Sequence, residues 1–151
     1  MAGTAQSTTY SFLDNSTNIL GPGGIADFTS GADKGGITIT PAMDANMQHI
    51  GADGSGMNVL IAGQPGTISV KLLKNSVTNN RLSVMYNLQK TSSALWGINT
   101  INIKSGVGDV TVCTGVAFKR RPTVVHDQDG EMNVWEFDCI NYQQLLASAI
   151  L

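Results

Sequence analysis

The sequence predicts a mainly β protein with one helix, and three observations support this fold class. Apolar and polar residues alternate at period two in several short stretches, which is typical of strands with one buried face. The 151 residues include 17 glycines and only 4 prolines, as expected for strands joined by tight turns. Only one convincing stretch has apolar residues at helical spacing, so an all-helical fold is not expected.

The first two strands are expected at Tyr10–Leu13 and Gly24–Thr29. Between them the sequence Gly21-Pro22-Gly23-Gly24 favours a turn, and we interpret it as the connection of a hairpin. A phosphate-binding loop is the alternative. It would require a following Gly-Lys-Ser/Thr motif or a helix that offers its N-terminal amides, and neither is evident here.

The next strand is expected at Gly36–Pro41, where two isoleucines alternate with two threonines. From Ala42 to Met57 the pattern becomes mixed, with three methionines and a turn signal at Ala52–Gly56. We interpret this excursion as a protruding hairpin or a long loop.

Thr67–Leu73 is predicted to be a central strand, because Ile68, Val70 and Leu72 share one face. The helix follows, with Asn75 or Ser76 as its cap. Its core-facing residues are Leu82, Met85, Tyr86 and Gln89.

Three further strands are expected at Ile98–Ile103, Asp109–Phe118 and Met132–Tyr142. The last two flank the turn signal His126–Gly130 and are predicted to form a hairpin. In the Asp109–Phe118 strand, one face is expected to carry Val110, Val112, Val116 and Phe118, with Thr111 and Cys113 opposite. In the last strand, Trp135, Phe137 and Cys139 are expected to share a face.

The low charge of the chain indicates that much of its surface is covered by other proteins. Asp, Glu, Lys and Arg make up 13% of the residues, about half of the roughly 25% found in soluble proteins. A membrane would be another explanation, but no apolar run approaches the roughly 20 residues that a spanning helix needs. We therefore expect one domain, residues 1–151, that forms a subunit of an assembly.

The net charge of -2 argues against electrostatic binding of nucleic acid, which requires a basic face. The basic cluster Lys119, Arg120 and Arg121 ends a strand and is closed by Pro122. We interpret it as a solvated strand end or an ion-pair site between subunits, with a phosphate site as the alternative.

Cys113 and Cys139 lie within strand patterns and lack metal-site spacing, so we expect free buried thiols. The polar start Met1–Thr9 has no signal-peptide pattern, and secretion is not expected. The apolar segment Leu145–Leu151 is too short to cross a bilayer, and we expect it to pack on a core or a neighbour.

Catalytic and metal-binding patterns are weak. His49 and His126 have no carboxylate, serine or cysteine at a spacing that marks a catalytic arrangement. The acidic run His126–Glu131 lacks the rest of a calcium-binding loop, so neither a metal nor a cofactor is expected. Glu136 and Asp138 share a strand face, which could serve acid–base catalysis, form a solvated face or repel phosphate in a channel.

Several short motifs follow one another over nearly the whole chain. They are Tyr10-Ser11-Phe12-Leu13-Asp14, Leu20-Gly21-Pro22-Gly23-Gly24, Gly51-Ala52-Asp53-Gly54-Ser55-Gly56-Met57, Ala62-Gly63-Gln64-Pro65-Gly66-Thr67, Leu72-Leu73-Lys74-Asn75-Ser76, Val116-Ala117-Phe118-Lys119-Arg120 and Trp135-Glu136-Phe137-Asp138. In their order and spacing the chain resembles phage tail tube proteins, and it looks like the variety found in contractile-tailed phages.

This resemblance implies a β-sandwich or barrel-like subunit with one flanking helix and a structural role without catalysis. Hexameric rings would stack into a hollow tube in the virion, assembled in the host cytoplasm, and would conduct DNA without binding it tightly. The implied partners are the sheath, baseplate, tape-measure and tail-terminator proteins.

The excursion from Pro41 to Met57 is the expected contact between rings, because a head-to-tail contact along an axis propagates a filament. Its candidate contact residues are Asp44, Met47, His49, Asp53 and Met57. Candidates for intersubunit or surface charge are Lys119, Arg120, Arg121, Glu136 and Asp138.

Two other hypotheses remain open on sequence alone. The first is a tube subunit of a related contractile secretion or injection system, which would have the same architecture. The second is a small hydrolase centred on His126 and Asp129, although it lacks an evident nucleophile.

Overall fold

The computed structural model describes residues 10–11, 13, 15–28, 32–106 and 108–146. Seven strands form one sheet in the order β2-β1-β7-β8-β9-β6-β3, and two more form a separate hairpin. The sheet contains β1 (Ser16–Gly21), β2 (Gly24–Asp27), β3 (Ala32–Pro41), β6 (Gly66–Leu72), β7 (Asn99–Lys104), β8 (Val110–Arg120) and β9 (Asn133–Leu145). The hairpin is β4 (Asn46–Ile50) with β5 (Gly56–Leu60); the helices are α1 (Val77–Gln89) and the short 3-10 helix η2 (Ser93–Leu95).

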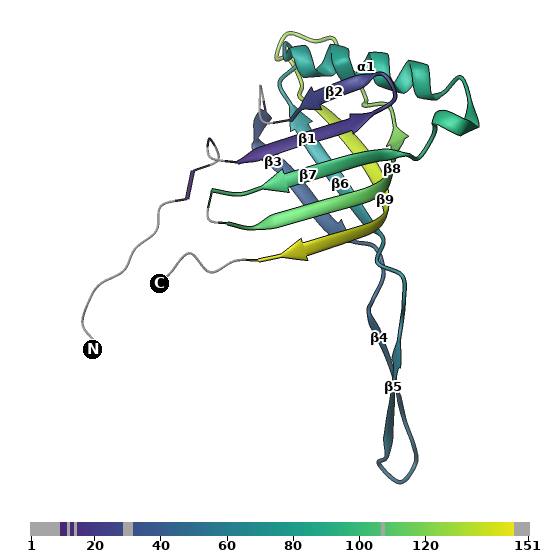
Figure 1. Ribbon diagram of the computed structural model, residues 1–151. Helices are drawn as coiled ribbons and strands as arrows, with labels where there is room; N and C mark the ends of the chain where they lie inside the picture. The colour runs from purple at the N-terminus through teal and green to yellow at the C-terminus, as the bar shows by residue number, and fades with distance from the viewer. Residues whose placement is uncertain (1–9, 12, 14, 29–31, 107, 147–151) are drawn as a thin grey trace, which may run out of the picture.

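The sheet curls into a half-barrel, with α1 at one end and the β4–β5 hairpin projecting from the other (Figure 1). All of its strand pairs are antiparallel. The curl brings distant strands together: Phe28, just after β2, and Phe137 of β9 have ring centroids 5.6 Å apart. The predicted mainly β class, with a barrel-like sheet, one flanking α-helix and a protruding hairpin, is confirmed.

The core fills the inside of the curl. Phe118 lies at its centre, with Phe137 at 4.9 Å and Trp135 at 6.0 Å between ring centroids. The alternation predicted for β6 and β9 is confirmed, because every second residue of Gly66–Leu72 and of Asn133–Cys139 is buried. Aromatic rings bury large apolar areas, so this cluster dominates the stability of the body.

Helix α1 begins at the predicted cap, where the Ser76 side chain accepts a hydrogen bond from the Thr78 amide at 3.3 Å. Leu82 and Met85 are buried against the sheet. Near its end, Gln89 and Asn99 of β7 exchange two amide hydrogen bonds of 2.8 Å. This buried amide pair fixes the helix to the sheet, because an unpaired buried amide is costly.

The predicted first strand is wrong, because Tyr10 and Leu13 lie outside the sheet and are 62% and 92% exposed. The first strand begins at Ser16 instead, and Thr17 occupies a buried position where an apolar residue would have signalled the strand. The hairpin connection at Gly21–Gly24 is confirmed by the β1–β2 pairing. The predicted β2 strand ends at Asp27, and Thr29 lies outside the described residues.

The face predicted for the first half of β8 is also wrong. Thr111 and Cys113 are buried together with Val116 and Phe118, while Val110 is only half-buried. The alternation slips between Cys113 and Val116, where β8 has one residue more than β7 and Gly115 adopts a φ of 64°. A bulge of this kind bends a strand and shifts its faces.

The remaining differences concern position and length. β6 pairs with strands on both sides but is next to the edge strand β3, and β8 holds the central place. Of the predicted C-terminal segment, Leu145 and Leu146 are about two-thirds exposed at 68% and 67%, and residues 147–151 lie outside the described part. Their predicted packing on a neighbour stays a prediction.

Candidate functional site: the arm and the strand edge at its base

The most distinctive surface feature is the projecting segment of residues 42–64, which we call the arm. It leaves the body between β3 and β6 and extends well away from it (Figure 1). Its base is closed by backbone hydrogen bonds from Ala42 N to Pro65 O, 3.0 Å, and from Ile61 N to Ala45 O, 2.9 Å. Every residue of its two strands is exposed. Isolated two-stranded hairpins are only marginally stable in water, so we expect the arm to be stabilised by a further contact.

The two faces of the arm differ in composition, because residues directly opposite each other in a strand pair share a face. Met47 pairs with Val59 and His49 with Met57, and we call this the apolar face. On the other face, the Asn46 and Gln48 side chains both donate to Asn58 Oδ1 at 3.3 Å, and Ile50 and Leu60 are exposed beside these amides. Exposed apolar side chains gathered on one face are typical of a protein contact surface.

The tip of the arm is held by Asp53. Its carboxylate accepts hydrogen bonds from the Ser55 hydroxyl at 2.6 Å and the Ser55 amide at 3.0 Å. These bonds hold the pKa of Asp53 below its ordinary value, with the hydroxyl as the larger cause. Gly54 adopts a φ of 90°, which a side chain would disfavour.

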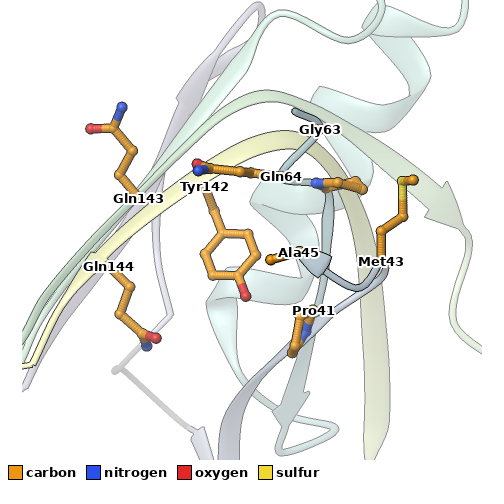
Figure 2. A pocket seen from close by; sticks show the side chains of 9 residues that line it. Pro41, Met43, Ala45, Gly63, Gln64, Tyr142, Gln143 and Gln144 are labelled. Atoms are coloured by element: carbon orange, nitrogen blue, oxygen red, sulfur yellow. The ribbon is translucent and has the colours of Figure 1, made fainter. Parts of the chain in front are cut away.

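A groove of about 510 Å³ lies between the arm base and the end of β9. The Tyr142 ring points into the space beside Pro41 and Ala45 (Figure 2). This ring also packs on Gly66, where a Cβ atom would lie 2.7 Å from it. The full lining is Pro41, Met43, Ala45, Gly63, Gln64, Pro65, Tyr142, Gln143 and Gln144.

The five predicted contact residues of the excursion are all exposed: Asp44, Met47, His49, Asp53 and Met57. The structure brings Met47, His49 and Met57 together on the apolar face. Asp44 lies at the base of the arm and Asp53 at its tip, so these two are separated from the three.

The predicted charged residues do not form one site. Arg120 pairs with Glu136, with 3.2 Å between Nε and Oε2. Arg121 turns to the helix, where its guanidinium lies 4.8 Å from the centre of the Tyr86 ring and donates to Asn87. The remaining two, Lys119 and Asp138, are exposed.

The two halves of the outer face of the curled sheet carry different kinds of side chain. Where β3, β6 and β9 pair, the outer face presents hydroxyls and carboxylates in opposed positions: Thr38, Thr40, Thr67, Ser69, Glu136 and Asp138. The exposed Lys71 of β6 lies on the same face. Ile140 interrupts this face at the bend of β9. The outer face of β1, β7, β8 and the end of β9 has one charge, Lys104, and carries Leu20, Val110, Val112 and Leu145.

Cys113 and Cys139 are free and buried, as predicted. Burial raises the pKa of the Cys113 thiol to about 12 and also raises that of Cys139. The Cys139 thiol donates to Asn141 O at 2.9 Å. Neutral buried thiols of this kind are structural and not nucleophilic.

The hydrolase hypothesis gains no support from the loop that contains His126 and Asp129. The Asp127 carboxylate accepts from the amides of Asp129 and Gly130, at 3.1 and 2.9 Å, and so serves a turn. The described residues contain no cluster of three His, Cys, Asp or Glu side chains suited to a metal ion. No helix in the same part of the chain is both long and apolar enough for a membrane span.

The end of β9 was not identified from the sequence as part of a candidate site. The segment Ile140–Leu145 contributes Tyr142, Gln143 and Gln144 to the groove and is paired on one side by β8. A usable signal existed, because a strand that ends in six residues without a charge or proline lacks the usual protection of an exposed edge.

A family model described as the bacteriophage PhiTE tail tube protein matches residues 7–147 of the chain. No significant match was found among curated proteins. The matched region includes the whole described sheet, the helix and the arm.

Proposed function

The chain belongs to the bacteriophage PhiTE tail tube protein family, and from that premise we propose that its copies form hexameric rings stacked into the tube of a contractile tail. As a member of this family it is a structural component of the virion. We further propose that residues 1–151 act as one tube domain, and that the tube assembles in the host cytoplasm.

The arm is the observation that carries this proposal. It presents an apolar face of Met47, His49, Met57 and Val59, and within the described residues no third strand pairs with β4 or β5. In a single subunit these apolar side chains stay exposed to water, whereas contacts between stacked rings would bury them. The ring-to-ring contact is proposed for Met47, His49 and Met57, with Asp44 and Asp53 at its two ends.

The tube is proposed to conduct DNA past the hydroxyl and acidic face of β3, β6 and β9. Asp138 is exposed there, and Glu136 is partly neutralised by Arg120. Lys71 is also exposed on this face. Hydroxyls with so few cations bind phosphate only weakly, and so do not slow the passage of a polyanion. The other outer face, with Leu20 and Leu145 exposed, suits a contact between subunits.

The proposed partners are the sheath outside the tube, the tape-measure protein inside it, and the baseplate and tail-terminator proteins at its ends. Lys119 is the penultimate residue of β8, and Arg121, just after β8, contacts Tyr86 of helix α1. They are proposed as surface charges for contacts between subunits or with the sheath.

Electron microscopy of the purified protein at high concentration tests this function. We expect rings or hollow tubes of constant diameter from the natural chain. A variant in which a short Gly-Ser linker replaces residues 45–61 is the matched control, and it should stay folded but form no tubes. A natural chain that remains monomeric even with sheath and baseplate proteins added would contradict the proposal.

A further inference from the structure

The C-terminal half of β9 is an open strand edge. Along its first half β9 pairs with β6, from Asn133 to Cys139, and with β8. Beyond Cys139 the pairing with β8 continues to Leu145, but on the other side the described residues supply only a single bridge, between Gln64 and Asn141. The end of β9, as far as Leu145, is therefore available to pair with a further strand.

A hydrogen bond of Tyr142 shows which way the backbone groups at the end of β9 point. The Tyr142 amide donates to Gln64 O at 3.1 Å and so points away from β8. Since alternate residues of a strand direct their backbone groups to the same side, the N–H and C=O of Gln144 also point away from β8. Gln144 is exposed, and these two groups border the groove at the arm base.

The other two edges of the sheet are protected, and this one is not. β2 has only four residues, and the carbonyl of Asp27 at its end accepts a 2.8 Å hydrogen bond from Thr78 of α1. β3 has a register irregularity between Ala32 and Ile37 and ends at Pro41. Natural proteins block exposed edges with such devices. Their absence from Ile140–Leu145 indicates that this edge pairs with another chain.

The arm of a second copy fits this edge. Both arm strands lack charged residues and proline, and each has one unpaired side within the described part of the chain. The apolar face of the arm matches the groove, whose lining includes Pro41, Met43, Ala45 and Tyr142. Within the same chain only the base of the arm lines the groove, because the strands β4 and β5 project away from the end of β9 (Figure 1).

We propose that the arm of a copy in the neighbouring ring adds as a strand to the edge of β9 at Gln144, with its methionine face against the groove. Strand addition of this kind gains backbone hydrogen bonds that are independent of sequence, while side-chain pockets set the register. This inference rests on the proposed function, since a tube is what places a second arm at this position.

Replacing Gln144 with proline tests the edge directly. Gln144→Pro removes an N–H that points away from β8, so the β8–β9 ladder keeps its hydrogen bonds and the chain stays folded. We expect an unchanged melting temperature and a concentration for tube assembly that rises by about tenfold or more, because the contact repeats at every subunit. Gln144→Ala keeps the N–H and should assemble normally. Normal assembly of folded Gln144→Pro would overturn the proposal.

Cross-linking identifies which segment of a second copy pairs with the edge of β9. Tubes are grown from equal mixtures of Gln144→Cys with either His49→Cys or Val59→Cys chains, whose thiols lie on the arm face proposed to meet the groove, and are then oxidised. We expect disulfide-linked dimers from at least one arm position and none from mixtures of Gln144→Cys with Ile25→Cys, which places the thiol on β2. Dimers through Ile25 alone, or tubes without any arm link, would overturn the inference while leaving the tube function intact. A natural chain that forms no tubes would instead contradict the proposed function.

Discussion

The body and the arm of this protein are both antiparallel β structure, yet they are stabilised in different ways. In the body, side chains from six strands and the helix are buried together, and Phe28, Phe118 and Phe137 are in ring contact. The arm has a complete set of backbone pairs from Asn46 to Leu60 but buries none of the side chains of its two strands. Backbone pairing alone contributes little net stability. We therefore expect the body to be stable by itself and the arm to depend on a neighbouring chain for its order.

The largest expected effect is loss of the aromatic core. Phe137→Ala should destabilise the dispersed chain by about 3–5 kcal/mol, because it leaves a cavity among close-packed rings. The matched change Met57→Ala removes a large apolar side chain from the arm, and should shift the same free energy of unfolding by less than about 0.5 kcal/mol while weakening tube assembly. Chemical denaturation and turbidity measure the two effects. Equal destabilisation by both changes would show that the arm folds as part of the body.

A smaller effect is expected from the buried amide pair. Gln89→Leu leaves the Asn99 amide without its 2.8 Å partner and should cost about 1–3 kcal/mol. Gln48→Leu in the arm removes an equivalent amide that is exposed, so little change is expected. Thermal denaturation of both variants measures the difference. An unaffected Gln89→Leu chain would mean that this pair does not hold α1 to the sheet.

The sequence was informative wherever one face of an element is buried. The alternation of Ile68, Val70 and Leu72, and of Trp135, Phe137 and Cys139, reports a core on one side, and both strands form as predicted. Ser76 was recognised as a cap because its hydroxyl has a specific chemical role. The arm was recognised from its Gly-rich tip and its mixed composition.

The failures arose where local pattern does not control the structure. A polar residue, Thr17, is buried in β1, so the alternation that marks a strand is interrupted there. The face of β8 changes at Gly115 because of a bulge relative to β7, which is a property of strand pairing. The open edge of β9 likewise depends on where β6 begins, at Gly66. The local sequence shows only that Ile140–Leu145 lacks the charge or proline that usually protects an edge.

The smallest expected effect concerns the arm tip and pH. Folding lowers the pKa of Asp53 below the ordinary value of 3.8, so its carboxylate supports the tip above that pH. The support is lost as the pH falls through the lowered pKa. NMR titration should show an Asp53 pKa that rises towards the ordinary value in Ser55→Ala, while the body remains unchanged. An Asp53 pKa that is the same in both chains would mean that the Ser55 bonds do not form in solution.

Hydrogen–deuterium exchange of the dispersed chain and of assembled tubes tests most directly whether the arm depends on its neighbour. Amides of the body strands β6, β8 and β9 should be protected in both states, whereas amides of β4 and β5 should exchange rapidly in the dispersed chain and become protected in the tube. Protection of the Gln144 amide should appear together with theirs. Arm amides that are already protected in the dispersed chain, or that stay unprotected in the tube, would contradict this account.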